Sequence, residues 1–239
     1  MRALSTLLRG AAELLLPSTC AACGALTDGE RSLCAACAAT LEPIASPCLR
    51  CGLPLPSGAT AVACLGCVRA PPPFSRARSP FVFGGELAVA MRRWKLGGQP
   101  ERTRALGRLL APSVLTLPPT VDALVPVPLH PRRLAARQFN QASLLAREAR
   151  ALGGVGPPVR ELLDRVRDTP AQARLEAAAR RANVRGAFAV TRGQRCADLH
   201  LVVVDDVMTT GSTAGACARA LLDGGASRVD VLTLARALP

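Results

Sequence analysis

The chain has 239 residues, a length that accommodates one or two compact domains and excludes a large multidomain assembly. Apolar residues make up 49% of it and charged residues 20%, a balance that permits a buried core and excludes a disordered tail. The formal net charge of +13 favours an anionic partner, although Lys95 is the single lysine among 30 basic residues, a skew that a GC-rich genome also produces.

The amino-terminal segment predicts a short docking helix over residues 1–16. Leu4 and Leu8 fall on one helical face, while Arg9 and Glu13 interrupt the apolar stretch and no cleavage-like site follows, which argues against a signal peptide. No apolar run in the chain reaches the roughly 18 residues of a membrane-spanning helix. We therefore expect no integral membrane insertion.

Residues 17–70 contain eight of the ten cysteines as four C-x-x-C pairs, separated by 10, 10 and 12 residues. Two such turns supply the four thiolates of a tetrahedral zinc site, so this segment predicts a double zinc ribbon with two structural Zn²⁺ ions. Pairing of consecutive units is the shorter-loop choice, and interleaved pairing stays open. The predicted zinc ligands are Cys20, Cys23, Cys34, Cys37, Cys48, Cys51, Cys64 and Cys67.

Two other uses of the cysteines compete with zinc. A disulfide framework suits secreted chains, and a redox role suits a single C-x-x-C unit rather than four copies in a segment with few large apolar residues. Metal also supplies the stability that so small a core lacks. The isolated Cys196 and Cys217 stand in apolar surroundings, which favours packing roles.

The prolines at 71–73 mark the start of a second domain over residues 71–239, because proline fixes φ and disfavours helix before it. The pattern that follows predicts a short strand at 81–83 and helices at 86–94 and 101–110.

Residues 69–108 carry nine basic side chains against two acidic ones and form the best candidate for an electropositive face. Four aromatic residues lie in this stretch and could stack on unpaired bases, so single-stranded DNA is an expected partner. The alternative is that the aromatic rings belong to the core beneath a solvated basic surface. These rings are Phe74, Phe81, Phe83 and Trp94.

The strongest site signal is the block from Leu201 to Thr213, which reads L-V-V-V-D-D-V-M-T-T-G-S-T. Its four apolar residues predict a strand buried on both faces of a parallel sheet, and residues 214–222 predict the helix after the loop. The amino end of such a helix offers backbone N–H groups, hydroxyls and the positive end of a dipole to a phosphate. The alternative is an ordinary strand-turn-helix connection.

This block resembles the phosphoribosyl-pyrophosphate (PRPP) motif of type I phosphoribosyltransferases. The resemblance implies that Asp205 and Asp206 hold the 2′ and 3′ hydroxyls of the ribose. It also implies that the 5′-phosphate lies on Thr209, Thr210, Gly211, Ser212 and Thr213.

A second buried strand is predicted over 121–127, and the segment after it resembles the family's pyrophosphate loop. In that loop, main-chain amides and a basic side chain meet the diphosphate together with Mg²⁺. The resemblance makes Leu129, His130 and Arg132 candidate contacts. His130 is more readily explained as structural than as a catalytic base, and no catalytic residue is assigned.

The wider pattern resembles the ComF/GntX family over nearly the whole chain. The matching segments are P-V-P-L-H-P-R-R at 126–133, F-N-Q at 139–141, Q-A-R-L at 172–175 and R-R-A-N-V-R-G-A-F at 180–188. The resemblance implies a parallel-sheet α/β fold of the type I phosphoribosyltransferase kind behind a double zinc ribbon. It also implies a mobile flap over 167–183 with anion contacts at Arg174, Arg180, Arg181 and Arg185.

One position departs from that family. Gln138 stands where the family usually has glycine before F-N-Q, which puts the local turn geometry in question.

The family is associated with DNA uptake in natural transformation on the cytoplasmic side. We therefore expect a cytoplasmic DNA-uptake factor that binds PRPP, contacts single-stranded DNA and associates peripherally with the uptake machinery. An active PRPP-dependent phosphoribosyltransferase in base or nucleotide salvage is a second hypothesis, and a non-catalytic PRPP-sensing regulator is a third. The carboxylate that activates the base in hypoxanthine-type salvage enzymes is absent, because Thr209 stands in its place.

Overall fold

The computed structural model describes residues 18–27, 31–56, 58, 62–96, 102–154, 156–169 and 184–239. The helix expected over 1–16 and the flap residues 170–183 lie outside the described residues. No helix in the described part has the length and apolar character needed to cross a membrane.

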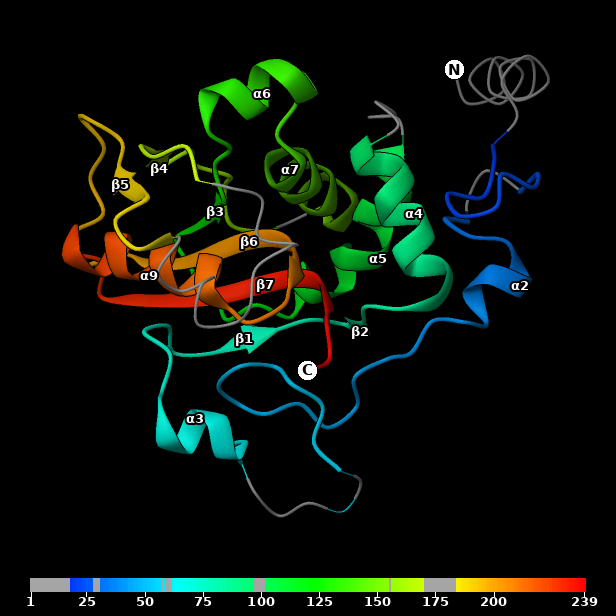
Figure 1. The fold of residues 1–239 in the computed structure, drawn as a ribbon, viewed down its shortest axis with the longest axis horizontal. Coiled ribbons are helices and arrows are strands. Elements are labelled where there is room, and N and C mark those ends of the chain that lie inside the picture. Colours follow the sequence, from blue (N-terminus) through cyan, green and yellow to red (C-terminus); the bar gives the residue numbers. More distant parts are fainter. Residues whose placement is uncertain are drawn as a thin grey trace.

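The centre of the molecule is a five-stranded sheet whose strands are all parallel (Figure 1). The strands lie in the order β1-β7-β6-β3, and β2 pairs with β7 beyond the end of β1. In the central register Val125 lies opposite Val203, and Val203 opposite Val231. The bounds are β1 Ala77–Arg78, β2 Phe81–Val82, β3 Ala123–Pro126, β6 His200–Met208 and β7 Arg228–Arg236.

Helices cover both faces of this sheet, and each face has its own apolar cluster. One face packs against α9 and a small antiparallel sheet of β4 and β5, while the other packs against α4, α5 and α7. The alternation of side chains along a strand explains the division: Val203 enters the first cluster, and its neighbours Val202 and Val204 enter the second. The bounds are α4 Gly85–Leu96, α5 Thr103–Leu115, α6 Pro131–Arg137, α7 Gln141–Gly153, α9 Ser212–Asp223, β4 Leu163–Arg165 and β5 Phe188–Val190.

The cysteine-rich segment packs onto the same sheet through its two halves, which contain the short helices α2 (Ala35–Ala38) and α3 (Leu65–Arg69). Cys20 and Cys37 belong to the apolar cluster on the α4 face, whereas Cys48 and Cys51 belong to the cluster on the α9 face. Each half of the ribbon therefore extends a different part of the core.

The predicted α/β fold class with a cysteine-rich module before it is confirmed. The helix expected over 101–110 continues to Leu115 despite Pro112, because Ala111 and Val114 extend its buried face. The strand expected from the apolar run at 201–204 also continues, through both acids to Met208, because β7 pairs with it along that length.

The flap expected over 167–183 lies between β4 and β5, which pair with each other antiparallel. Within the described residues, Arg185 is exposed in the turn before β5, and its carbonyl oxygen accepts a hydrogen bond of 2.5 Å from Arg167 Nη1. Arg174, Arg180 and Arg181 lie outside the described residues, so their role as anion contacts stays a prediction.

Candidate functional site

The carboxyl end of β6 carries both acids, and the pleat of the strand directs them to opposite faces of the sheet. Asp205 lines a pocket beside the amino end of α9. Asp206 is 8% exposed, and its Oδ2 lies 2.5 Å from the Lys95 ammonium on α4. The doublet is therefore divided between the pocket and an internal ion pair.

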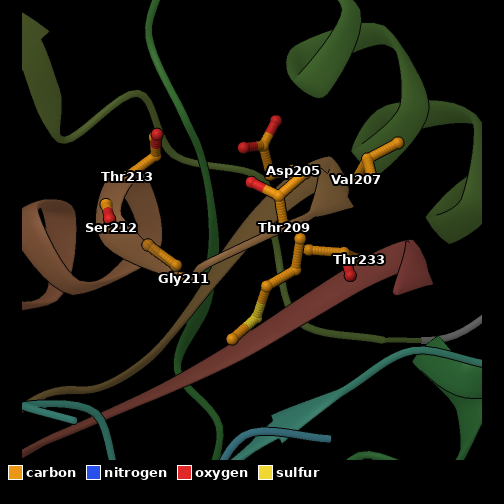
Figure 2. Close-up of a pocket in the computed structure, with 9 residues that line it drawn as sticks. Asp205, Val207, Thr209, Gly211, Ser212, Thr213 and Thr233 are labelled. Atoms are coloured by element: carbon orange, nitrogen blue, oxygen red, sulfur yellow. The ribbon is translucent and has the colours of Figure 1, made fainter. Parts of the chain in front are cut away.

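The pocket beside Asp205 is formed by the loop that joins β6 to α9 (Figure 2). Gly211 is the N-cap of α9, where it makes no side-chain cap hydrogen bond, and the first turn of the helix carries no acid. This end of the helix therefore presents its positive dipole end to the pocket. The lining residues are Asp205, Val207, Met208, Thr209, Gly211, Ser212, Thr213, Ala214 and Thr233.

Glycine is required at the centre of the loop. Gly211 has φ +75°, and a Cβ there would lie 2.8 Å from Met208 Cε. The Thr210 and Ser212 hydroxyl oxygens lie 2.7 Å apart, which holds the loop in a compact turn. The predicted phosphate-binding residues are thus brought together, with Thr210 bracing the loop rather than lining the pocket.

Burial and the neighbouring Asp206 charge together raise the pKa of the Asp205 carboxyl to about 7, against an opposing effect of Lys95. Arg165, on β4, also favours the charged form of Asp205. The pocket therefore holds an acid that exchanges its proton near neutral pH and sits close to cations on two sides.

The loop after β3 reaches the same edge of the sheet, because Pro126 pairs with Val204. His130 is the N-cap of α6, and its Nδ1 accepts a hydrogen bond of 3.4 Å from the Arg132 amide. The side chain of Arg132 is 82% exposed and lies 3.5 Å from Asp168.

The structure therefore gives His130 a capping role and directs Arg132 toward the base of the flap. Leu129 is half-buried in the same loop, and none of the three lines the pocket. Their contact with a diphosphate stays a prediction.

Three residues near the site did not figure among the predicted contacts. Lys95 was counted only as part of a basic stretch, and its ion pair with Asp206 depends on where α4 ends in space. Among the residues that the structure describes, Arg165 Nε and Gln141 Nε2 are buried donors without a hydrogen-bond partner. Gln141 belongs to the F-N-Q motif, which is the one signal in the sequence that pointed toward it.

The four C-x-x-C units pair consecutively into two clusters, in each of which the four Sγ atoms lie within 4.8 Å of one another. The Sγ atoms of Cys23 and Cys34 are 3.8 Å apart, and those of Cys51 and Cys64 are 3.6 Å apart. A tetrahedron with Zn–S bonds of about 2.3 Å has sulfurs about 3.8 Å apart, so both clusters fit Zn²⁺. The two predicted zinc sites are supported, with the shorter-loop pairing.

One thiol in each cluster is disposed to ionise. Burial opposes the charge, but hydrogen bonds from backbone amides outweigh it and lower the pKa of Cys20 and of Cys48 to about 6. Because thiolates are the zinc ligands, each cluster offers a first ligand near neutral pH. All ten cysteines are unpaired by disulfides, and Cys196 and Cys217 are buried as packing residues.

The aromatic residues of the basic stretch are not arranged for stacking on bases. Phe74 and Trp94 are at most 2% exposed, which supports their assignment to the core, and Trp94 Nε1 donates to the Thr103 hydroxyl at 3.0 Å. The basic residues also divide: Arg93 and Arg102 donate to the carbonyl oxygens of the first zinc knuckle. The stretch is therefore not one continuous nucleic-acid face.

Comparison with known proteins adds relatives of both halves of the chain. Residues 11–68 match the family model of the double zinc ribbon domain. The DNA utilization protein YhgH of Salmonella typhi is 37% identical over 190 residues, covering 77% of this chain and 82% of the relative. Competence protein F of Haemophilus influenzae is 34% identical over 160 residues, covering 63% of this chain and 68% of that protein.

Among solved structures, the glutamine PRPP amidotransferase of B. subtilis, in complex with ADP and GMP, aligns with a TM-score of 0.38 and 19% identity. The alignment covers 63% of this chain and 28% of that one. The double zinc ribbon match and the relatives that align over most of this chain, together with the parallel sheet and its acid doublet, identify the chain as a member of the ComF family.

Proposed function

We propose that this ComF-family protein serves DNA utilization in the cytoplasm through a pocket that binds PRPP. The process is supported by relatives that are named for DNA utilization and for competence. The observation that carries the ligand is the amino end of α9, which begins at a glycine N-cap beside Asp205, at the carboxyl edge of a parallel sheet. Ligands of open parallel sheets bind at this edge.

The polar groups of the pocket match the parts of PRPP. The loop from Thr209 to Thr213 would take the 5′-phosphate on backbone amides and hydroxyls, and Asp205 would accept hydrogen bonds from the ribose.

Mg²⁺ prefers oxygen ligands, so the carboxylate and hydroxyl oxygens of this pocket fit a magnesium-bound diphosphate. When bound, the ion would neutralise charge on the diphosphate. Asp206 and Lys95 would act from behind the pocket by setting the charge that Asp205 experiences.

An assay of pyrophosphate release with PRPP and a panel of bases, run beside calorimetric titration with PRPP, tests this proposal. Binding with release would identify an active phosphoribosyltransferase, and binding without release a protein that uses PRPP as a signal. Absence of PRPP binding, with and without Mg²⁺, would contradict the proposal.

Contact with single-stranded DNA is the second part of the proposal, supported by the net charge of +13 and by the names of the relatives. Phosphate contacts release counterions, so the affinity should fall steeply with salt concentration. An affinity for a single strand that is indifferent to salt would contradict this part alone.

A further inference from the structure

A second cavity lies at the opposite, amino edge of the sheet. Its volume is about 250 Å³, a little under the roughly 300 to 1,000 Å³ typical of small-molecule sites. Its apolar floor comes from the linker between the zinc clusters, from the segment between β1 and β2 and from the segment after α5, and the sheet residues behind it are at most 2% exposed. The apolar residues of the lining are Val202, Val231, Leu232, Ile44, Pro47, Pro80, Leu117 and Pro118.

Two arginines line this cavity, and their charges are incompletely compensated. Arg76 is 43% exposed in its side chain, and its recorded ionic contact is one of 3.9 Å from Nε to Asp230 Oδ2. Arg78 donates through Nη1 to the carbonyl oxygens of Ala77, at 3.0 Å, and Leu49, at 3.5 Å. Within the described residues, the remaining guanidinium N–H groups of both side chains have no partner.

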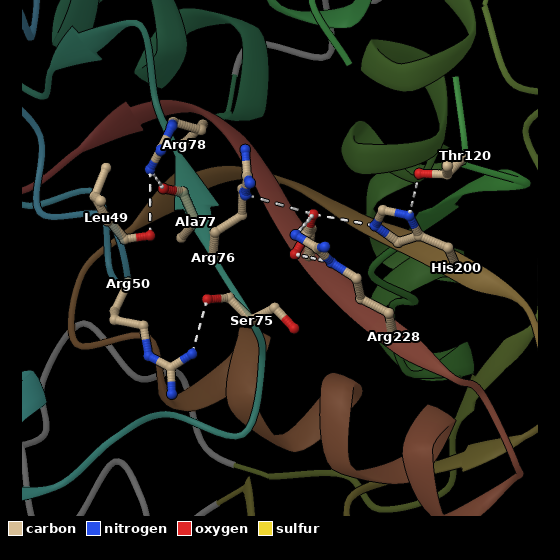
Figure 3. Close-up of polar contacts among 10 residues, drawn as sticks. Leu49, Arg50, Ser75, Arg76, Ala77, Arg78, Thr120, His200 and Arg228 are labelled. Carbon is tan, nitrogen blue, oxygen red and sulfur yellow. Dashed lines mark hydrogen bonds and ion pairs between the residues drawn. The ribbon is translucent and has the colours of Figure 1, made fainter. Parts of the chain in front are cut away.

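Asp230, the one acid in the cavity lining, is held by closer partners (Figure 3). Arg228 donates to both of its oxygens at 3.2 and 3.3 Å, and His200 Nε2 lies 3.1 Å from Oδ2. Arg76 and Arg228 thus share one buried carboxylate. Burial and the nearby Arg76 charge lower the pKa of Arg78, so an anion placed between them would relieve that repulsion.

We propose that this amino-edge cavity binds a nucleoside phosphate, with the phosphate on Arg76 and Arg78 and the base against the apolar floor. Guanidinium groups match phosphate oxygens with two parallel hydrogen bonds. The pyrrolidine rings of Pro47, Pro80 and Pro118 offer apolar C–H groups to the face of a base, and Ser113 and Thr116 line the same cavity. Inorganic phosphate alone would leave the apolar floor unfilled.

The nucleoside phosphate has two sources, a free nucleotide or one unit of a single DNA strand, and the second rests on the proposed role in DNA utilization. The site is separate from the carboxyl-edge pocket, because the two share no lining residue. An experiment can therefore contradict nucleoside phosphate binding at the amino edge without contradicting PRPP binding at the carboxyl edge, and the reverse also holds.

The test is titration of the full-length, zinc-loaded protein with deoxynucleoside monophosphates, inorganic phosphate and a short single-stranded oligonucleotide. Arg76→Gln and Arg78→Gln should each weaken nucleotide binding about tenfold or more, because each removes a charged donor. Arg192→Gln, which removes an exposed arginine in the turn after β5, is the matched charge control and should bind as wild type does. PRPP binding should be the same in all three variants.

Ser113→Trp fills the cavity and should abolish nucleotide binding while zinc content stays at two ions per chain. Competition between the oligonucleotide and the monophosphate would identify a strand as the source, and binding of the monophosphate alone would identify a free nucleotide. The proposal is overturned if neither binds, if phosphate binds as tightly as the nucleotide, or if both arginine variants match Arg192→Gln.

Discussion

Lys95 places a positive charge from α4 beside the acid doublet of the candidate PRPP site. Its ammonium lies 2.5 Å from Asp206 Oδ2, with 28% and 11% of the two side chains exposed. In a chain whose other cations are arginines, this compact point charge stands directly behind the pocket acid. The positive charge of Lys95 balances the negative charge of Asp206 and also lowers the pKa of Asp205.

Lys95→Met should raise the pKa of Asp205 above about 7, because Lys95 now favours the charged form. It should also lower the free energy of unfolding by about 1–2 kcal/mol, since Asp206 is left without its cation in a largely buried position. Carboxyl ¹³C NMR and urea unfolding measure the two effects, and Lys95→Arg should restore most of both. An unchanged pKa of Asp205 in Lys95→Met would contradict an electrostatic effect of Lys95 on Asp205.

Asp205 makes the stability of the folded chain depend on pH. Its pKa of about 7 lies above the 3.8 of an unperturbed aspartate, so the folded state binds the proton more tightly than the unfolded state. The resulting stability is complete below about pH 4 and is lost as the pH rises through about 7, at about 1.4 kcal/mol for each pKa unit.

Asp205→Asn should remove this part of the pH dependence between about pH 4 and 7. Urea unfolding across that range measures it, with Asp223→Asn at an exposed position as the matched control. Equal slopes for Asp205→Asn and wild type would show that Asp205 is not the acid with the raised pKa.

At the scale of elements, the α6–α7 turn explains the departure from the family pattern at residue 138. Gln138 ends α6 with φ +67°, in the left-handed region that favours glycine. Asn140 then begins α7: its Oδ1 accepts from the amides of Ala142 and Ser143, and its Nδ2 donates to Val127 at 3.1 Å. The hydrogen bonds of Asn140 thus stabilise the turn although Gln138 has an unfavourable left-handed conformation.

Gln138→Gly should therefore stabilise the protein by about 0.5–1 kcal/mol, because glycine adopts this φ without a steric penalty. Ala136→Gly, two residues earlier and within α6, is the control and should destabilise by a similar amount. Thermal or urea unfolding distinguishes them. A lower stability for Gln138→Gly would mean that the interactions of the Gln138 side chain stabilise the fold by more than its left-handed backbone conformation destabilises it.

The elements also show what sequence reasoning can reach. The acid doublet, the loop and the helix of the site follow one another in the chain, so the local pattern of residues 201–222 was enough to predict a strand, a loop and a helix in that order. Lys95 and Arg165 enter the site from distant segments, and no local pattern places them there. The amino-edge cavity is assembled from five separated stretches, and the burial of Trp94 depends on packing against α5 and Phe139.

At the scale of the whole molecule, Arg236 joins the second cysteine cluster, which contains Cys51, to the loop between β6 and α9. Its Nε donates to the Cys51 carbonyl oxygen at 3.3 Å, and its Nη1 donates to the carbonyl oxygens of Met208, at 2.9 Å, and Thr209. The first cluster is tied instead to α4 and α5 through Arg93 and Arg102. The two zinc sites are therefore coupled to different parts of the fold.

Loss of the second zinc should consequently weaken PRPP binding more than loss of the first. Cys67→Ser and Cys34→Ser should each retain about one zinc ion in place of two, because each removes a ligand from one cluster. Cys196→Ser, outside both clusters, should retain both ions. Metal analysis and PRPP titration test this, and equal PRPP affinities for the two cluster variants would contradict the coupling through Arg236.

The central claim is that the carboxyl edge of the sheet binds PRPP, and titration of wild type and an Asp205→Asn, Asp206→Asn double variant tests it most directly. Wild type should bind PRPP with Mg²⁺, the double variant should lose at least about tenfold in affinity with the removal of the Asp205 acceptor and of the Asp206 charge behind it, and Asp223→Asn should bind as wild type does. Equal affinity in wild type and the double variant would contradict the account.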